Sequence, residues 1–315
     1  RSLRRFNAAM NERYGAPPSK MRGRKLIARG EAFTVSLSPR GDYVFAPVLD
    51  FLRLRALAGV EAGDRKSYAR VLRWGGALGW LKVAMGPKGL ELTLSENLAP
   101  HLRPLVANVR GAFDLDADMS AVDAHLARDG DLKRDVKREP GVRVPGMLDG
   151  FECAVRAVLG QQVTVAGAKT LTERLVARFG ESLERGPDGL SRAFPTADAM
   201  AHAGASAIAK IGLPRKRAET LFALAEASAA GALPLARGAV AAGRAALAEI
   251  PGIGPWTVEY VALRALGDPD AYPATDIALI NALGRKGETL DHLKPWRAYA
   301  AIRLWRRGAS KGARS

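Results

Sequence analysis

Residues 250–260 read Ile-Pro-Gly-Ile-Gly-Pro-Trp-Thr-Val-Glu-Tyr, and this stretch decides the fold of the chain around it. Gly252 and Gly254 lack a Cβ, so the backbone can turn tightly there and reach left-handed dihedral angles. Pro255 suits the first position of a helix, where its missing N–H has no acceptor to lose. Alanine-rich residues 240–249 precede the turn, and apolar residues follow it at helical spacing. The stretch therefore predicts a helix, a tight hairpin and a second helix.

The predicted hairpin has the properties of an anion site. The first N–H groups of the second helix, up to Thr257, have no acceptor within the helix and lie at the positive end of its dipole. Together with the amides of Gly252, Ile253 and Gly254, they can bind a phosphate. An ordinary helix end followed by a restart is the alternative, and Gly-x-Gly alone favours it.

The composition indicates a polyanionic partner. Lysine and arginine number 48 against 32 acidic residues, so the formal net charge of the 315 residues is +16. The charge favours nucleic acid over an anionic membrane, because the chain has no uninterrupted apolar run of about eighteen residues and no basic leader before an apolar core. Cys153 is the only cysteine, which excludes an internal disulfide and an iron–sulfur cluster. Its apolar neighbours predict a buried structural thiol.

The chain divides into three predicted parts, and the expected fold class is α+β. Residues 1–25 form a separate basic unit. Residues 30–115 form a small mixed α/β domain, because apolar residues alternate in strand fashion at 33–37 and at 90–94. Residues 116–315 are mostly α-helical, with two helical subdomains and a cleft between them, and glycines and prolines separate the helices. The charged, proline-punctuated segment 131–145 is the expected connector into the helices.

Three passages resemble one family, the helix-hairpin-helix DNA glycosylases, and within it the 3-methyladenine DNA glycosylase II group. They are residues 151–169, 211–218 and 250–283. The resemblance implies a monomeric base excision repair enzyme that needs no cofactor and no metal, acts on double-stranded DNA with alkylated bases, and works in the bacterial cytoplasm at the nucleoid. Residues 1–25 resemble the end of an AraC-type helix-turn-helix, which implies that the chain is the C-terminal part of a longer polypeptide.

The resemblance places Asp276 at the catalytic aspartate of this superfamily. Breaking an N-glycosidic bond leaves cationic character on the sugar, which a nearby carboxylate stabilises while water attacks. Simple capping of a helix is the alternative role for Asp276. Superfamily members that also cut the strand have a lysine after Gly-Ile-Gly-Pro, whereas this chain has Trp256. The resemblance therefore implies hydrolysis without lyase chemistry.

Trp256, Tyr260 and Trp296 are the candidate rings of a base pocket. A base alkylated at a ring nitrogen is cationic, so stacking on a desolvated ring gains about 2 kcal/mol from the cation–π interaction. Burial in the core is the alternative for each ring. Trp305, near Ile302 and Leu304, is assigned to the core.

Further candidate DNA contacts come from two loops. Gln161 and Gln162 stand where, by resemblance, the family fills the gap that an everted base leaves. Arg215 follows Leu213-Pro214 in a basic run and is a candidate phosphate contact. The resemblance also allows a structural cation at the backbone carbonyls of Ala248 and Ile250.

More arginines lie near the end of the chain, at Arg303, Arg306 and Arg307. Most such charges are solvated, and a few could contact phosphate. Two classes of function remain open: a monofunctional glycosylase, and a non-enzymatic DNA-binding or transcriptional regulatory protein, which the basic residues 1–25 also support. The same fold acting on a different damaged base is a third reading.

Overall fold

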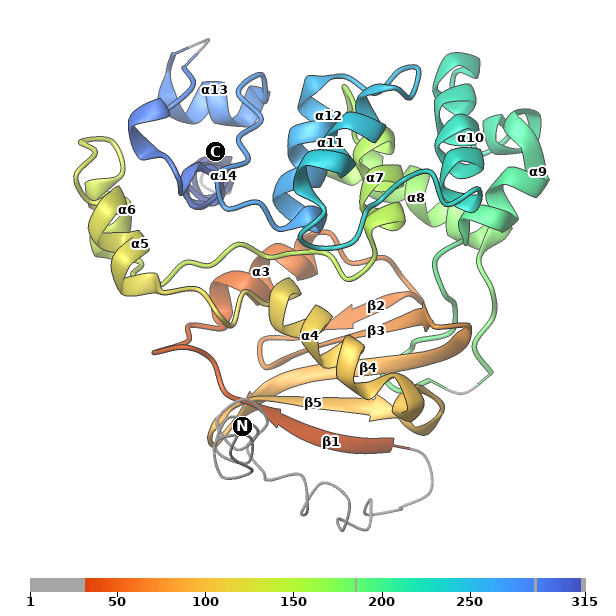
Figure 1. Cartoon of the computed structure of the whole chain (residues 1–315), viewed down its shortest axis with the longest axis horizontal. Helices are drawn as coiled ribbons and strands as arrows, with labels where there is room; N and C mark the ends of the chain where they lie inside the picture. Colours follow the sequence, from red (N-terminus) through yellow and green to blue (C-terminus); the bar gives the residue numbers. More distant parts are fainter. Residues whose placement is uncertain (1–31, 185, 286–287, 313–315) are drawn as a thin grey trace, which may run out of the picture. The chain divides into compact units, whose positions relative to one another are not determined.

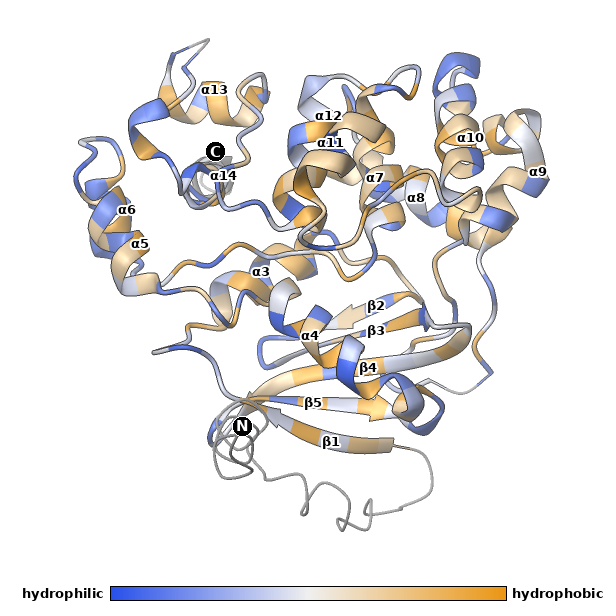
Figure 2. Ribbon diagram, viewed as in Figure 1, coloured by the Kyte–Doolittle hydropathy of each residue, from blue (hydrophilic) through white to orange (hydrophobic). Residues whose placement is uncertain are grey.

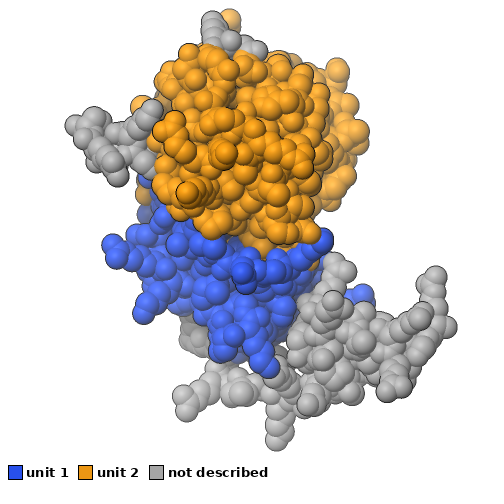
Figure 3. All heavy atoms as spheres, turned by 90° about the vertical axis from the view of Figure 1, so that its left-hand side faces the viewer, with its two compact units in different colours: residues 1–110, 181–194 blue, residues 111–180, 195–315 orange. Residues whose placement is uncertain are grey.

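The structure is a computed structural model, and it describes residues 32–184, 186–285 and 288–312. The expectation for residues 1–25 therefore lies outside the described residues. The chain separates into two compact units, residues 1–110 with 181–194 and residues 111–180 with 195–315 (Figure 3).

Unit 1 is built on an antiparallel sheet of five strands in the order β1-β5-β4-β3-β2 (Figure 1). Its strands are β1 Ala32–Leu37, β2 Glu61–Gly63, β3 Ser67–Trp74, β4 Ala77–Gly86 and β5 Gly89–Ser95. The predicted strands at 33–37 and 90–94 are confirmed as β1 and β5, which pair with each other. Helices α3 Ala46–Leu54, η1 Glu96–His101 and α4 Leu102–Ala112 complete this part of the chain. The mixed α/β character expected for it is confirmed.

Strand β3 is buried on both faces, and the second cover comes from a distant segment. Ala69 and Val71 of β3 pack in one cluster with Leu190 and Ala193. The backbone N–H of Ser191 donates to the carbonyl of Gly59 at 2.8 Å, which fixes this segment to unit 1. The prediction of a continuous helical part from 116 to 315 is therefore wrong for residues 181–194, whose apolar side chains cover the sheet.

Unit 2 is helical, as the sequence predicted for the part of the chain that follows the α/β domain. Its elements are α5 Met119–Leu126, α6 Lys133–Arg138, α7 Gly150–Leu159, α8 Val165–Phe179, α9 Ala197–Ala209, α10 Arg215–Ala229, α11 Val240–Ala248, α12 Pro255–Val261, η2 Ala262–Leu266, α13 Ile277–Leu283, η3 Asp291–Leu293 and α14 Arg297–Gly312. Helices α7, α12 and η2 pack together, and the hydropathy colouring shows many apolar residues along α7 and α12 (Figure 2). Among the described residues no helix is both long and apolar enough to cross a membrane.

Segment 131–145 is more than a connector, because it contains α6. Asp135 and Val136 of this short helix are buried. Asp135 pairs with Arg307 at 2.5 Å, and Glu139 pairs with Arg306 at 2.6 Å. The two arginines from α14 hold α6 in place, so they are structural and not solvated as the sequence suggested.

Candidate active site

The hairpin between α11 and α12 is present, and its two glycines differ in backbone conformation. Gly252 has φ +89°, and a Cβ there would lie 2.1 Å from the hydroxyl oxygen of Thr220 on α10. Only glycine fits this position. Gly254 is extended, with φ −97° and ψ 176°, so the expected left-handed turn there is wrong. It is the N-cap of α12, with open space where its Cβ would be, and Pro255 is the first helical residue as expected.

Gln161 fastens the hairpin to the end of α7. Its side-chain amide donates to the carbonyl oxygen of Gly252 at 3.1 Å and to the hydroxyl of Thr257 at 3.0 Å. Thr257 is 1% exposed and Ile253 is 7% exposed. The side chains of Ile253 and Thr257 are therefore buried, and only their backbone groups remain for a ligand, whereas Gln161 is half-buried; the DNA contacts expected at these three residues stay a prediction.

Gln162, the next residue, is placed differently. It is exposed and adopts a left-handed conformation with φ +59°, in the loop between α7 and α8. Val163 and Val165 beside it are also exposed, at 38% and 44%. Because the Gln161 amide joins this loop to the hairpin, both turns belong to one surface of unit 2.

Asp276 caps α13 and is held by three neutral donors. Its Oδ1 accepts the N–H of Leu279 at 3.0 Å and the indole N–H of Trp305 at 3.0 Å. Its Oδ2 accepts the indole N–H of Trp256 at 2.8 Å. The capping role is therefore present, and the catalytic role stays a prediction: the indole bonds fix both carboxyl oxygens while Asp276 remains partly exposed.

Three aromatic rings line up beside this carboxylate. Trp256 and Tyr260 are stacked, with centroids 5.3 Å apart and planes at 20°. Tyr260 and Trp305 are 6.0 Å apart and tilted. Assignment of Trp305 to the core is therefore wrong, because its ring nitrogen reaches Asp276. Trp296, predicted for the base pocket, instead meets His125 edge-on at 5.0 Å.

The hydroxyl group of Tyr260 is hydrogen-bonded to a buried arginine. Arg264 donates to the Tyr260 hydroxyl at 2.8 Å and to the carbonyl of Pro145 at 2.5 Å. Arg264 is 2% exposed, so its remaining donors must also be satisfied within the protein. These bonds keep the ring of Tyr260 in the row between the two indoles.

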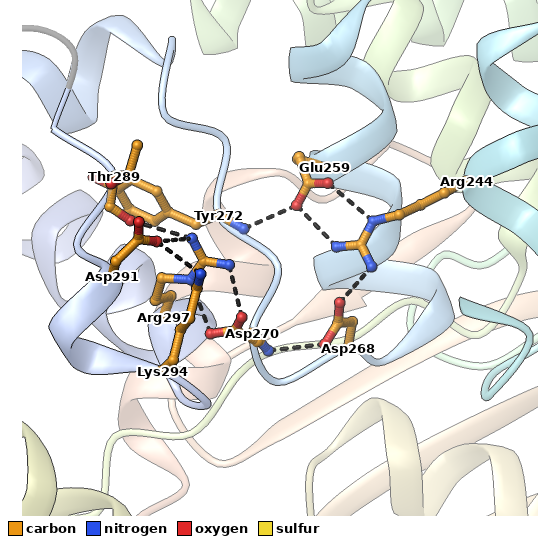
Figure 4. A network of polar contacts seen from close by, with 9 residues as sticks. All are labelled: Arg244, Glu259, Asp268, Asp270, Tyr272, Thr289, Asp291, Lys294 and Arg297. Atoms are coloured by element: carbon orange, nitrogen blue, oxygen red, sulfur yellow. Dashed lines mark hydrogen bonds and ion pairs between the residues drawn. The ribbon is translucent and has the colours of Figure 1, made fainter. Parts of the chain in front are cut away.

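A network of ion pairs holds the loop that leads to Asp276 (Figure 4). Glu259 on α12 accepts two bonds from Arg244 on α11, both at 2.9 Å. The same carboxylate accepts the backbone N–H of Tyr272 at 3.0 Å, and Arg244 also reaches Asp268 at 2.6 Å. The loop therefore has a fixed path between η2 and Asp276.

Arg297 forms the second group of ion pairs in this network. It binds Asp270 through two bonds of 2.9 and 2.6 Å, and Asp291 at 3.1 Å. A pocket of about 390 Å³ lies among these residues. It is walled by ion pairs, so its groups are already neutralised, and the chemistry is better assigned to Asp276 and its rings. Burial and the charges of Glu288 and Asp276 raise the pKa of Tyr272 to about 12, so this phenol stays neutral at physiological pH.

Three other expectations can be placed. Arg215 is exposed and pairs with Glu219 at 2.7 Å, so its phosphate contact stays a prediction. Cys153 is 1% exposed, and burial raises the pKa of its thiol to about 12, which confirms a structural role. The carbonyl of Ile250 accepts the N–H of Ile253 at 3.0 Å and retains a second lone pair, so the cation at Ala248 and Ile250 stays a prediction.

Ile277 was missed by the sequence reasoning. It directly follows Asp276 and is 70% exposed, an unusual state for a large apolar side chain. Its one signal in the sequence was its adjacency to the candidate aspartate. An apolar surface next to a partly exposed carboxylate excludes water from one side of the group.

Comparisons with known proteins agree with this geometry. Residues 34–149 match the profile of the AlkA N-terminal domain, and residues 155–306 match that of the HhH-GPD superfamily base excision DNA repair proteins. DNA-3-methyladenine glycosylase 2 of Escherichia coli is 34% identical over 87% of this chain and 96% of its own length. A probable bifunctional transcriptional activator/DNA repair enzyme AlkA of Mycobacterium tuberculosis is 34% identical over 96% of this chain. The chain spans 64% of the length of that relative.

Solved structures share the fold. A 3-methyladenine DNA-glycosylase from Archaeoglobus fulgidus aligns with a TM-score of 0.74 at 20% identity, covering 87% of this chain and 98% of its own. The 8-oxoguanine glycosylase/lyase of Clostridium acetobutylicum, in complex with double-stranded DNA, aligns with a TM-score of 0.64 at 15% identity, covering 91% and 97%. At these identities the likeness concerns architecture alone.

Proposed function

Because this chain belongs to the helix-hairpin-helix base excision DNA repair proteins, and within them to the DNA-3-methyladenine glycosylase family, we propose that it hydrolyses the N-glycosidic bond of alkylated bases in double-stranded DNA. The observation that carries the proposal is the carboxyl group of Asp276, which two indole N–H groups orient beside a row of aromatic rings. A carboxylate held by neutral donors keeps its negative charge for a ligand.

The proposed chemistry uses that charge at the sugar. As the bond to the base lengthens, positive charge develops on the deoxyribose, and the Asp276 carboxylate stabilises it. Water then completes the hydrolysis and leaves an abasic site. The residue that follows Gly-Ile-Gly-Pro is Trp256, which offers no amine for a Schiff base, so we propose a reaction without strand cleavage.

The base itself is proposed to stack on the row formed by Trp256, Tyr260 and Trp305. An alkylated base is cationic, so both the ring faces and the nearby carboxylate favour it over a neutral base. The positive charge also makes it a better leaving group. The exposed side chain of Ile277 would cover the edge of the everted nucleotide.

The backbone of the hairpin is proposed to hold the DNA strand. The early amides of α12 have no acceptor within the helix, and the space beside Gly254 is open. Gln162, with its left-handed backbone, is proposed to enter the gap left by the everted base. Gln161 acts as a positioning residue that ties the two turns together.

The deciding experiment replaces Asp276 by Asn and measures the release of bases from methylated duplex DNA in a single turnover. Loss of the carboxylate charge is expected to slow release at least about 100-fold. Binding to duplex with an abasic site should change little, because the hairpin is untouched. Asp198→Asn, at an exposed position of α9, is the matched control and should release bases at the wild-type rate.

The result also separates the alternatives. Chromatographic identification of the released bases defines the substrate class and shows whether an oxidised or mismatched base is preferred instead. If wild-type protein binds methylated duplex but releases no base, the enzyme assignment fails and a DNA-binding regulatory protein becomes the better interpretation.

A further inference from the structure

The segment from Arg128 to Glu139, which includes α6, is nearly neutral in sequence but not on its surface. It contains five basic residues, Arg128, Lys133, Arg134, Lys137 and Arg138, and four acidic residues, Asp129, Asp131, Asp135 and Glu139. By composition alone its charges cancel almost completely. Among the residues that the structure describes, the acidic ones are paired, whereas most of the basic ones are not.

Every acid of the segment is bound to a basic side chain from the C-terminal part of unit 2. Asp129 accepts a bond from His292 at 2.7 Å, and Asp131 pairs with Arg285. Asp135 and Glu139 pair with α14 at 2.5 and 2.6 Å through Arg307 and Arg306, respectively. The negative charges of the segment are therefore paired with, or hydrogen-bonded to, basic side chains of the C-terminal part of unit 2, although Asp131 itself is exposed.

Four of the five basic residues have no acidic partner among the described residues. Arg128, Lys133, Arg134 and Lys137 are all exposed. Within the described part of the chain these four side chains make no hydrogen bond or ion pair, whereas Arg138 pairs with Asp135. The outer side of the segment therefore presents four cations without compensating acids, and Figure 2 shows α6 as strongly hydrophilic.

One arginine connects this surface to the proposed active site. Arg307 donates to the carbonyl of Ala282 in α13 at 3.3 Å and to Asp135 of α6 at 2.5 Å. Asp276 caps the opposite end of α13, which at seven residues is about 10 Å long, or about three base pairs of duplex. Segment 128–139 is thus bound to α14 near the end of α13 that lies opposite Asp276.

We propose that Arg128, Lys133, Arg134 and Lys137 form a second contact with the phosphate backbone, a few base pairs to one side of the everted nucleotide. This basic surface rests on the proposed function, since duplex DNA is taken as the ligand of the Asp276 site. Flexible basic side chains without acidic partners suit phosphate oxygens, which are read by charge and not by sequence. The contact adds affinity and orientation, with no preference for a base.

The test is a triple variant, Lys133→Gln, Arg134→Gln and Lys137→Gln, which removes the charge but keeps a flexible polar side chain and a similar helix propensity. Its affinity for duplex with an abasic site is measured over a range of salt concentrations. Each lost phosphate contact should reduce the slope of log affinity against log salt by about 0.9, so up to about 2.7 in total, and binding at moderate salt should weaken about tenfold or more.

The matched control is Arg65→Gln, Lys66→Gln and Lys88→Gln in unit 1, which removes the same charge from exposed residues. This control should leave the slope nearly unchanged. Two further duplexes carry the abasic site close to one end or close to the other. The triple variant should weaken binding to only the duplex whose long arm extends past α13 toward α6.

Equal slopes and affinities for the two triple variants would overturn the second contact, even if Asp276→Asn still abolishes base release. Conversely, an orientation-dependent loss of binding supports the contact even if no base is released, because abasic duplex needs no chemistry. Thermal unfolding of both triple variants, expected at the wild-type temperature, ensures that the fold is intact in each case.

Discussion

The carboxylate of Asp276 and the carboxylates of segment 128–139 are held in opposite ways, although both sets lie in unit 2. Asp276 is bound by three neutral N–H groups, so its charge is oriented but not cancelled. Asp135 and Glu139 are bound by guanidinium groups, so their charge is cancelled. The difference shows how one chain keeps a negative charge where we propose that it stabilises a developing cation and cancels it where we propose that phosphate binds.

The largest expected effect comes from breaking another carboxylate–guanidinium pair of unit 2, between Asp123 and Arg303. Arg303 of α14 is 1% exposed at its side chain and pairs with Asp123 at 2.5 Å. Arg303→Met should lower the free energy of unfolding by about 3 to 5 kcal/mol, because it leaves the partly buried Asp123 without its cation. Denaturant unfolding measures the loss. The control Arg65→Met, at an exposed position, should change stability by under about 0.5 kcal/mol.

Asp114 sharpens the comparison, because it is a buried carboxylate whose hydrogen-bond donors are neutral. It accepts bonds of 3.3 Å from the Tyr299 hydroxyl and from the backbone N–H of Val144. Burial raises its pKa from 3.8 to about 6, despite the opposing charges of Arg143 and Arg237. The folded state therefore prefers the neutral acid.

The sign of the pH dependence follows from that preference. The stabilising contribution of neutral Asp114 is complete below the unfolded pKa and is lost as pH rises through about 6. Asp114→Asn, which stays neutral, should gain stability relative to wild type over this window, by up to about 3 kcal/mol. The measurement is the difference in unfolding free energy between the two proteins at several pH values. A constant difference from acid to neutral pH would contradict it.

The smallest expected effect concerns the neutral donors of Asp276. Trp305→Phe keeps an aromatic ring but removes one N–H bond to the carboxylate. A hydrogen bond to a charged group is worth about 1.5 to 3 kcal/mol, so single-turnover base release should slow about 10- to 100-fold. Trp296→Phe, whose ring meets His125, should leave the rate close to wild type. Equal losses in the two variants would return Trp296 to the base pocket.

The sequence was informative where the signal is local. Gly252, Pro255 and the following apolar spacing predicted the hairpin, because backbone freedom and helix starts depend on adjacent residues. Asp276 was proposed through the family resemblance, which includes its spacing from the hairpin. Strand β3 was missed because segment 181–194 covers it, so its two faces are both buried and the usual alternation is absent.

The failures concern partners far apart in the chain. Trp305 and Trp296 lie on or near the same helix, and nothing local shows which of them faces Asp276. The charges of Asp135 and Glu139 are cancelled by residues more than a hundred positions later, so segment 131–145 was expected to be only a connector. The bond from Gln161 to the carbonyl of Gly252 also joins residues far apart, 91 positions, and no local pattern shows it.

The paired indole bonds to Asp276 also give the protein an internal optical probe. Two of its five tryptophans donate to the same carboxyl group. Indole emission responds to the charge and polarity around the ring nitrogen, so a ligand that displaces or neutralises that carboxyl group will alter the intrinsic fluorescence. Binding of a ligand beside Asp276 can thus be followed in real time without an attached dye. The variant Asp276→Asn provides the spectral reference.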